Sequence, residues 1–166
     1  NSALLFPTLT ALMNHGTILV VGAPGIGKTT LLEFAGHFFS GTSLDEILEA
    51  EILGNPQLRK EEIIAGLETV KMVHDGIKEV IPTKFLQCPV KIWDEVNRTP
   101  SDMVSCAMKL VDTGKAVYEG VLLHSPVGWL GATANYADEG TFQLTPPFLD
   151  RFDVAVMKTS TQPWDL

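Results

Sequence analysis

Long apolar runs, cysteine pairs and histidine clusters are all scarce in this 166-residue sequence. No apolar stretch reaches the roughly 20 residues that a membrane-spanning helix needs, and no signal-peptide pattern opens the chain, so we expect no membrane association. The two cysteines, Cys88 and Cys106, form neither a disulfide framework nor a metal-binding spacing. Buried, reduced thiols are the expectation, which favours a cytoplasmic protein. The four histidines show no zinc-binding spacing.

Positive charge is also scarce, because 12 Lys and Arg residues stand against 20 Asp and Glu residues, giving a net charge of −8. Binding to a phosphate backbone needs clustered Lys and Arg, so the composition argues against nucleic acid as the main partner. Hydrophobic residues make up 45% and charged residues 19%, which is typical of one globular domain over residues 1–166. The chain begins at Asn1 without methionine, and we interpret it as a portion of a longer protein.

A glycine-rich stretch, ILVVGAPGIGKTTLLEF, runs from Ile18 to Phe34 and matches the pattern G-x-x-x-x-G-K-[ST]. Its glycines allow successive backbone N–H groups to form an anion nest, and the following helix adds its positive end. Lys28 would then reach the β- and γ-phosphates, and the Thr29 hydroxyl would bind Mg²⁺. A chance turn between strand and helix is the alternative, and the matching context disfavours it. The predicted phosphate-binding residues are Gly22, Ala23, Pro24, Gly25, Ile26, Gly27, Lys28, Thr29 and Thr30.

Strand and helix patterns alternate along the chain, which predicts an α/β fold with a mainly parallel sheet covered on both faces. Apolar strands are predicted at residues 17–21, 90–93, 127–133 and 154–157, and a β-hairpin at 115–125. Helices are predicted at residues 6–14, directly after the phosphate loop, and at 43–53, 56–73, 99–113 and 146–152. Residues 74–86 fit no single pattern.

Finer signals predict the ends and faces of these helices. Ser43 and Glu46 form a capping box, and Thr99 is the predicted cap of a helix that has Pro100 in its first turn and ends at Gly114. One apolar face of the helix after the phosphate loop is expected to turn inward, carrying Leu31, Leu32, Ala35, Phe38 and Phe39. In the 56–73 helix the inward residues would be Ile63, Ile64, Leu67 and Val70.

Polar residues end two of the predicted strands. Asp94 and Glu95 follow one strand, and Asn135 follows another. Ligands of a parallel sheet sit at the carboxyl ends of its strands, so Asp94 is placed to hold Mg²⁺ and Glu95 to accept a proton from water attacking the γ-phosphate. Asn135 could hold that water or a phosphate oxygen. The plainer alternatives are an exposed acidic pair opening a loop and an ordinary asparagine in a turn.

Arginine occurs only three times, and two of the three stand beside these motifs, as Arg98 in DEVNR and Arg151 in FLDRFD. Arg151 could act as an arginine finger on a nucleotide bound by a neighbouring subunit. The alternative is an intrachain ion pair with Asp150 or Asp153, which would add little stability at a surface.

Taken together, GAPGIGKT (22–29), DEVNR (94–98), ATAN (132–135) and EGTFQLTPPFLDRFD (139–153) resemble the MoxR family of AAA+ ATPases. The resemblance extends from about Leu12 to Met157. It implies a three-layer P-loop NTPase fold with a five-stranded sheet, an insertion in the second helix within residues 41–86, and a hairpin before the first sensor strand. The family's helical lid has no counterpart after residue 157, so we expect weak nucleotide binding and little hydrolysis from this chain by itself.

The same resemblance implies functions for particular residues. Lys28 and Thr29 would contact phosphate and Mg²⁺, Asp94 would hold Mg²⁺ and Glu95 would be the hydrolytic base. Asn135 would be the first sensor, and Arg151 a finger acting in trans. Arg98 matches the family's Asn-Arg pair, with a role at a subunit interface as one possibility. The family forms hexameric rings that use ATP to remodel or mature partner proteins, often ones with a von Willebrand factor A domain.

Three functions other than an ATPase are alternatives for this sequence. A GTPase is suggested by NYAD at 135–138, but Tyr136 replaces the lysine of the guanine signature. A DNA-translocating motor would need a basic, aromatic-interleaved surface, whereas the 115–125 hairpin carries Lys115 and His124 against Glu119. A nucleotide-gated scaffold that binds ATP with little turnover would not need all four of Lys28, Glu95, Asn135 and Arg151.

Overall fold

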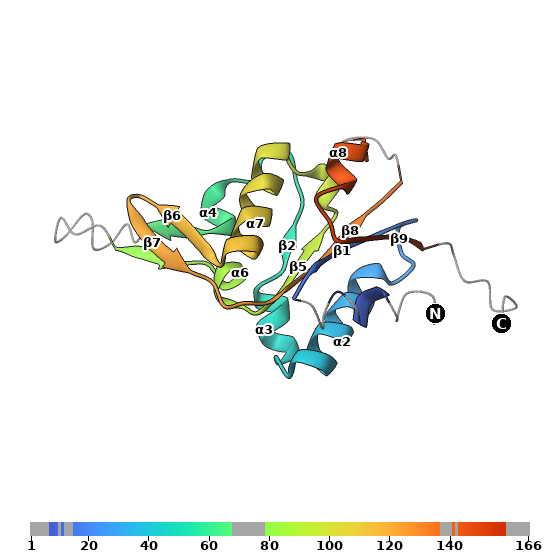
Figure 1. Cartoon of the computed structure of the whole chain (residues 1–166), viewed down its shortest axis with the longest axis horizontal. Helices are drawn as coiled ribbons and strands as arrows, with labels where there is room; N and C mark the ends of the chain where they lie inside the picture. The colour runs from blue at the N-terminus through green and yellow to red at the C-terminus, as the bar shows by residue number, and fades with distance from the viewer. Residues whose placement is uncertain are drawn as a thin grey trace, which may run out of the picture.

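A five-stranded parallel sheet forms the middle layer of the structure (Figure 1). The computed structural model describes residues 7–9, 11, 15–67, 79–136, 141 and 143–158. The strands of the sheet are β1 (Thr17–Gly22), β2 (Ile52–Leu53), β5 (Val90–Asp94), β8 (Trp129–Ala134) and β9 (Val154–Lys158). Their spatial order is β2-β5-β8-β1-β9, and each neighbouring pair runs parallel. The predicted α/β class and parallel sheet are therefore confirmed.

Helices cover both faces of this sheet, with α2 and α3 on one side and α7 on the other (Figure 1). The helices are α2 (Lys28–Ser40), α3 (Leu44–Glu49), α4 (Lys60–Ile63), α6 (Lys84–Gln87), the 3₁₀ turn η1 (Val96–Arg98), α7 (Ser101–Thr113) and α8 (Pro146–Leu149). Residues 7–9 and 11 are also helical, as predicted for 6–14, whose other residues lie outside the described part of the chain.

Strand β1 shows why two separate cores form. Its side chains alternate between the faces of the sheet, so Ile18 joins the cluster that contains Leu32 of α2, whereas Leu19 joins the cluster that contains Val104 of α7. All six residues of β1 are buried, as they are in β8. Burial on both faces explains the continuous apolar runs in the sequence. The parallel pairing of the strands brings the carboxyl ends of β1, β5 and β8 to one edge of the sheet.

Two small antiparallel sheets extend together from the side of the main sheet (Figure 1). One pairs β3 (Ala65–Leu67) with β4 (Val80–Pro82), and the other pairs β6 (Lys115–Tyr118) with β7 (Val121–His124). The second is the predicted hairpin, which turns at Glu119 (φ 48°) and Gly120 (φ 80°). It is tied to α4, because Lys60 donates to the carbonyl oxygen of Val117 at 3.0 Å.

Tertiary pairing shortens two of the predicted helices. The Ser43 capping box is present, but α3 ends at Glu49 rather than Leu53, because Ile52 pairs with Trp93 and residues 52–53 become the edge strand β2. The helix predicted at 56–73 is wrong in its described part, where only Lys60–Ile63 is helical and 65–67 pair with β4. Residues 68–73 and 74–78, including the predicted inward Val70, lie outside the described residues.

The predicted inward face of α2 is only partly correct. Leu32 and Ala35 are buried, but Phe38 is 78% exposed and Phe39 is 49% exposed. The reason is the close approach of helix and sheet at Gly36, where an added Cβ would lie 2.5 Å from Val90 Cγ1. This contact turns the Leu32–Gly36 side of the helix toward the sheet and carries the two phenylalanines outward.

Helix α7 begins one residue later than the sequence suggested. Pro100 occupies the cap position and makes no side-chain cap bond, and the helix ends at Gly114 as predicted. The Thr99 hydroxyl is buried and finds no hydrogen-bond partner among the described residues. Thr99 is therefore not the helix cap. Within the same part of the chain, no helix is both long and apolar enough to cross a bilayer.

A lysine is buried in the core at the start of β5. Lys91 is 2% exposed, and its ammonium donates to the carbonyl oxygen of Cys88 and lies 6.0 Å from the ring centre of Phe85. Burial lowers the pKa of Lys91 to about 8. Because the unfolded chain keeps the proton to higher pH, this group destabilises the fold at neutral pH, and that loss is relieved as pH rises from about 8 toward 10.5.

We therefore expect Lys91→Met to raise the free energy of unfolding by about 2 kcal/mol at pH 7, with a difference that shrinks toward pH 10.5. Chemical denaturation at several pH values measures the effect. Lys84→Met is the matched control, because Lys84 is exposed and pairs with Glu49 at 3.2 Å, so its loss should change stability by less than about 0.5 kcal/mol. An unchanged or lowered stability of Lys91→Met at pH 7 would contradict the prediction.

Candidate nucleotide-binding site

The loop between β1 and α2 has the backbone of an anion-binding turn. Gly25 and Gly27 adopt left-handed φ angles of 76° and 73°, and Gly27 is the cap of α2. A Cβ at either glycine would meet no atom within 4 Å, so the space beside the loop is open. Side chains other than glycine rarely adopt these angles, which explains why the sequence places glycine at both positions. The backbone N–H groups of the first turn of a helix point toward its N-terminal end, and the N-terminal end of α2 follows this loop directly.

Lys28 lies at the centre of the site and is only 6% exposed. Its ammonium donates to the carbonyl oxygens of Gly22 (3.1 Å) and Ala23 (2.8 Å) and to Oδ1 of Asn135 (2.8 Å). The first helical residue of α2 is thus bonded to the residue that follows β8, 107 positions along the chain. This places the predicted phosphate-binding lysine beside the predicted sensor asparagine.

Asp94 ends β5 next to the first turn of α2. Its Oδ1 atom accepts hydrogen bonds from the hydroxyls of Thr29 (2.6 Å) and Thr133. The two residues predicted to hold Mg²⁺, Thr29 and Asp94, are therefore in direct contact. A hydroxyl and a carboxylate oxygen are the hard ligands that Mg²⁺ takes alongside phosphate oxygens and water.

Glu95 follows in a left-handed conformation, with φ 50° and ψ 43°. Its two carboxylate oxygens have different partners, because Asn135 Nδ2 donates to Oε1 at 2.7 Å and Arg98 Nε lies 2.8 Å from Oε2. Non-glycine residues rarely adopt this backbone conformation, and such strain concentrates at functional sites. Arg98 thus contacts the predicted base within its own chain, which the sequence did not indicate.

Two further residues support the site without having been assigned a role from the sequence. Thr133 is fully buried and also accepts a hydrogen bond from the backbone N–H of Glu95 at 3.0 Å. Asn97 donates to the carbonyl oxygen of Asn135 at 3.1 Å. Thr133 belongs to the motif ATAN and Asn97 to the motif DEVNR. The sequence does not show that these two motifs are in contact, and the pairing of β5 with β8 does.

A pocket of about 310 Å³, the phosphate pocket, lies at the carboxyl edge of the sheet. Its lining residues are Pro24, Gly25, Gly27, Lys28, Thr29, Thr30, Asp94, Glu95 and Asn135. Gly22 and Ala23 contribute through their carbonyl contacts with Lys28. The set combines a cation and a left-handed glycine loop with the Thr29–Asp94 pair, and it fits a nucleotide phosphate chain with Mg²⁺.

Arg151 lies elsewhere. It follows α8, and its guanidinium donates to the carbonyl oxygen of Ser101 at the start of α7, at 3.1 Å. Asp153, one of its two suggested partners, instead accepts bonds from the backbone N–H and hydroxyl of Thr17. Arg151 borders a separate pocket of about 180 Å³, and it is not among the described residues that line the phosphate pocket. The structure does not bring Arg151 to its own chain's site.

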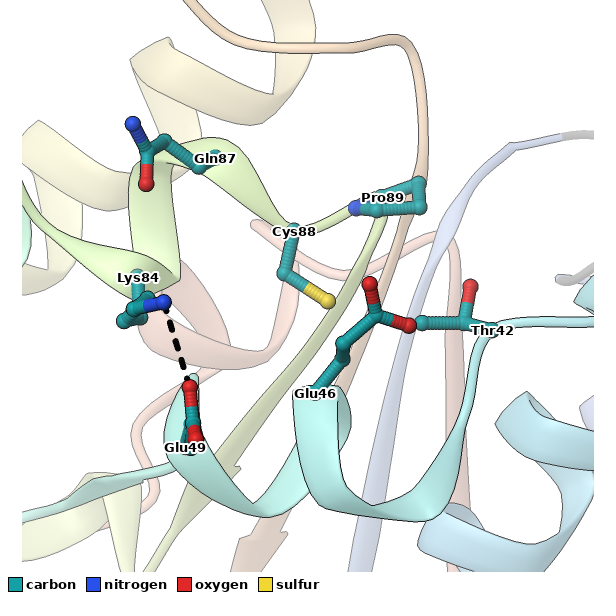
Figure 2. A pocket seen from close by; sticks show the side chains of 7 residues that line it. All are labelled: Thr42, Glu46, Glu49, Lys84, Gln87, Cys88 and Pro89. Atoms are coloured by element: carbon teal, nitrogen blue, oxygen red, sulfur yellow. Dashed lines mark ion pairs between the residues drawn. The ribbon is translucent and has the colours of Figure 1, made fainter.

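A second polar pocket of about 150 Å³ lies between α3 and α6 (Figure 2). Its walls carry the Lys84–Glu49 ion pair and the Cys88 thiol, which points toward Glu46 in Figure 2. Cys88 is buried and Cys106 is partly buried, and both are free thiols. Burial raises the pKa of each thiol, so neither has the character of a reactive thiolate.

Two glutamates form an acidic pair beside Asp94. Burial raises the pKa of Glu51 to about 7, reinforced by the negative charges of Glu33 and Asp94, and burial also raises the pKa of Glu33. An acid whose pKa is raised by folding binds its proton more tightly in the folded state. This group therefore stabilises the fold below about pH 4.5, and that stabilisation is lost as pH rises through 7.

We expect Glu51→Gln to raise the free energy of unfolding by about 1 kcal/mol at pH 8, a value reduced because the side chain is partly exposed. It should have little effect at pH 4, where the neutral amide replaces a carboxyl group that is already neutral. Thermal melting across this pH range measures it. Glu46→Gln is a control of opposite sign, because the hydrogen bonds from Ser43 lower the pKa of Glu46. If Glu51→Gln melts below the wild type at pH 8, the carboxyl pair does not oppose folding.

A glycine packs directly behind the Glu95 backbone. A Cβ at Gly54 would lie 2.2 Å from the carbonyl oxygen of Glu95, so that backbone would have to move. We expect Gly54→Ala to destabilise the protein by about 3 kcal/mol and to slow any turnover that depends on Glu95. Gly66→Ala is the matched control, because its Cβ would meet nothing within 4 Å. Equal unfolding midpoints for the two variants would contradict the prediction.

Comparison with solved structures relates this site to known folds. The chain is similar to a crystal structure of a candidate ATPase from Cytophaga hutchinsonii, with 23% identity, a TM-score of 0.66, and coverage of 96% of this chain and 45% of that one. It is also similar to a chain in the complex between subunits BchI and BchD of magnesium chelatase, with 18% identity, a TM-score of 0.65, and coverage of 99% and 59%. The chain thus spans about half the length of these structures.

No protein-family model matches the sequence, and no curated protein matches it. At identities below 25% the likeness to solved structures concerns the fold. The sheet order, the helices on both faces and the glycine loop between β1 and α2 agree with that likeness. The chain therefore shares a three-layer α/β fold with these structures, and its five-stranded parallel sheet is the one its sequence predicted.

Proposed function

We propose that this chain is the nucleotide-binding core of a MoxR-type AAA+ ATPase, which binds and hydrolyses ATP at subunit interfaces of a ring and remodels or matures a partner protein. One observation carries the proposal. Asn135 bonds to both Lys28 (2.8 Å) and Glu95 (2.7 Å), so the phosphate-binding cation and the base are joined through one side chain. The Thr29–Asp94 pair lies at the same pocket.

In this proposal different residues of the site have different roles in binding and hydrolysis. The glycine loop and Lys28 bind the phosphate chain of ATP, replacing contacts that Lys28 makes to Ala23 and Asn135 in the structure. Thr29 and Asp94 would hold Mg²⁺, which neutralises charge on the phosphate oxygens when bound. Glu95 accepts a proton from the attacking water, and Asn135 orients that water or a γ-phosphate oxygen.

Arg151 supports the oligomeric part of the proposal. Its guanidinium is held at the start of α7, away from its own chain's phosphate pocket, so a role in hydrolysis requires the pocket of a neighbouring subunit. A homo-oligomeric ring, hexameric in the resembling family, would supply that neighbour. The same proposal includes a client protein, which in that family often has a von Willebrand factor A domain. It also includes a cytoplasmic location.

The decisive experiment is calorimetry with Mg·ATP and Mg·GTP, followed by measurement of phosphate release from the purified full-length protein. We expect ATP to bind more tightly than GTP and to be hydrolysed. A clear preference for GTP would favour the GTPase alternative. Binding of DNA that strengthens at low salt would favour a DNA motor. Binding of ATP without detectable turnover would favour the nucleotide-gated scaffold.

Sedimentation tests the ring separately. We expect ATP to promote assembly, because the proposed Arg151 contact needs a nucleotide in the neighbouring subunit. A species that stays monomeric with ATP at high protein concentration would leave Arg151 without a target and would contradict the finger assignment.

A further inference from the structure

We propose that Thr133 is a positioning residue for ATP hydrolysis, which fixes the Mg²⁺-binding carboxylate and the catalytic base relative to each other. This inference rests on the proposed function of the site. Thr133 belongs to β8 and is fully buried. Its hydroxyl donates to Oδ1 of Asp94 and accepts the backbone N–H of Glu95 at 3.0 Å. A single hydroxyl therefore bonds to both acids.

The pairing of the strands explains why a side chain is needed at this point. The β5–β8 ladder runs in register from Val90 with Trp129 to Trp93 with Ala132 and stops there. Beyond it, Glu95 turns into the left-handed region and its N–H leaves the ladder. The Thr133 hydroxyl takes that N–H in place of a backbone carbonyl. It therefore holds Glu95 in a conformation that non-glycine residues otherwise avoid.

The same hydroxyl also limits the rotation of Asp94. Oδ1 accepts hydrogen bonds from the hydroxyls of Thr29 and Thr133, which belong to two different elements, α2 and β8. Thr29 is itself a proposed Mg²⁺ ligand, so its bond to Asp94 is subject to change when the metal binds. Thr133 does not line the phosphate pocket and has no such second role. It is the constant anchor of the carboxylate.

Because Thr133 is buried, it cannot contact the nucleotide and is not itself a catalytic residue. Thr133 has no exposed surface, so it acts on the reaction only through Asp94 and Glu95. The expected consequence of losing its hydroxyl is a misplaced base and a misplaced metal ligand, with the phosphate-binding loop intact. Turnover and the benefit of Mg²⁺ should fall, while binding of the nucleotide alone should not.

The test compares Thr133→Val, Thr133→Ser and a control, Thr83→Val, in the full-length protein. Thr83 has the same kind of bonding, since its hydroxyl donates to the Ile63 carbonyl (2.8 Å) and accepts the Leu86 N–H (3.1 Å), but it lies beside α6. Two readouts are used: kcat and KM for ATP, and the gain in ATP affinity when Mg²⁺ is added, measured by calorimetry. The second readout does not require turnover.

For Thr133→Val we expect kcat to fall roughly 30-fold and the Mg²⁺-dependent gain in affinity to fall roughly fivefold, with metal-free ATP binding changed less than about twofold. Thr133→Ser should recover most of both losses, and Thr83→Val should show neither. Thr133→Val with wild-type kcat and an unchanged Mg²⁺ gain would overturn the inference. Equal losses in Thr83→Val would show a general effect of stability and would also overturn it.

Failure of the proposed function gives a different pattern. If the wild type shows no Mg²⁺-dependent gain in ATP affinity and no hydrolysis, the proposed ATPase is wrong and the positioning role falls with it. If the wild type shows both and Thr133→Val retains both, only the role of Thr133 is wrong.

Discussion

Glu95→Gln is expected to lower the rate of ATP hydrolysis by roughly 1000-fold while leaving ATP affinity within about threefold of the wild type. The amide is nearly the same size as the carboxylate but cannot accept a proton from water. It retains a carbonyl oxygen for Asn135 Nδ2, which donates to Glu95 Oε1 at 2.7 Å, but its NH2 group cannot accept from Arg98 as Oε2 does. Affinity should stay near that of the wild type because Lys28 and the glycine loop, which would bind the phosphate chain, are unchanged. Single-turnover phosphate release and calorimetry measure the two quantities.

Glu119→Gln is the matched control for this substitution. Glu119 is the other described glutamate with a left-handed backbone, at φ 48° compared with 50° for Glu95, and it lies at the tip of the β6–β7 hairpin. The same change at a similar backbone conformation should leave hydrolysis unaltered. If hydrolysis survives in Glu95→Gln, Glu95 is not the base, and the scaffold interpretation gains support.

Lys28→Met is expected to weaken Mg·ATP binding by roughly 100-fold. Methionine keeps much of the apolar stem, but the ammonium that would contact the phosphate oxygens is lost. The free protein also loses the hydrogen bonds that Lys28 donates to Gly22, Ala23 and Asn135. Calorimetric titration with Mg·ATP measures the affinity, and thermal melting without nucleotide measures the effect on the fold.

Lys91→Met, at the buried lysine in β5, is the control for Lys28→Met. Lys91→Met also replaces a buried ammonium, but it lies under α6 with Phe85 and Cys88 and does not line the phosphate pocket. Its nucleotide affinity should equal that of the wild type. Near-wild-type affinity in Lys28→Met, or an equal loss in Lys91→Met, would show that the Lys28 ammonium does not bind phosphate.

Much of the phosphate site could be read from the sequence, because its parts are adjacent in the chain. The glycines of the loop were expected to permit left-handed backbone, and Gly25 and Gly27 adopt it in the structure. The strand before the loop and the helix after it followed from apolar patterning alone. Asp94, Glu95 and Asn135 were also expected at one edge of a parallel sheet, where the structure has them.

Contacts between distant segments could not be read in this way. The helix predicted to reach Leu53 ends at Glu49 because β5 offers a neighbouring edge to residues 52–53. The outward position of Phe38 depends on how closely Gly36 meets Val90. Local sequence patterns cannot predict either feature, because each depends on contact with a strand that is distant in the sequence.

The sequence by itself determined the class of fold, the phosphate loop and the identity of the polar groups at the strand ends, since turn geometry and apolar periodicity are local properties. Only the tertiary structure decided how those groups are joined: Thr133 between Asp94 and Glu95, Asn135 between Lys28 and Glu95, and Arg98 against the base. These bonds connect the ends of strands β5 and β8 with helix α2 and the turn η1, and the register of β5 against β8 brings those ends side by side.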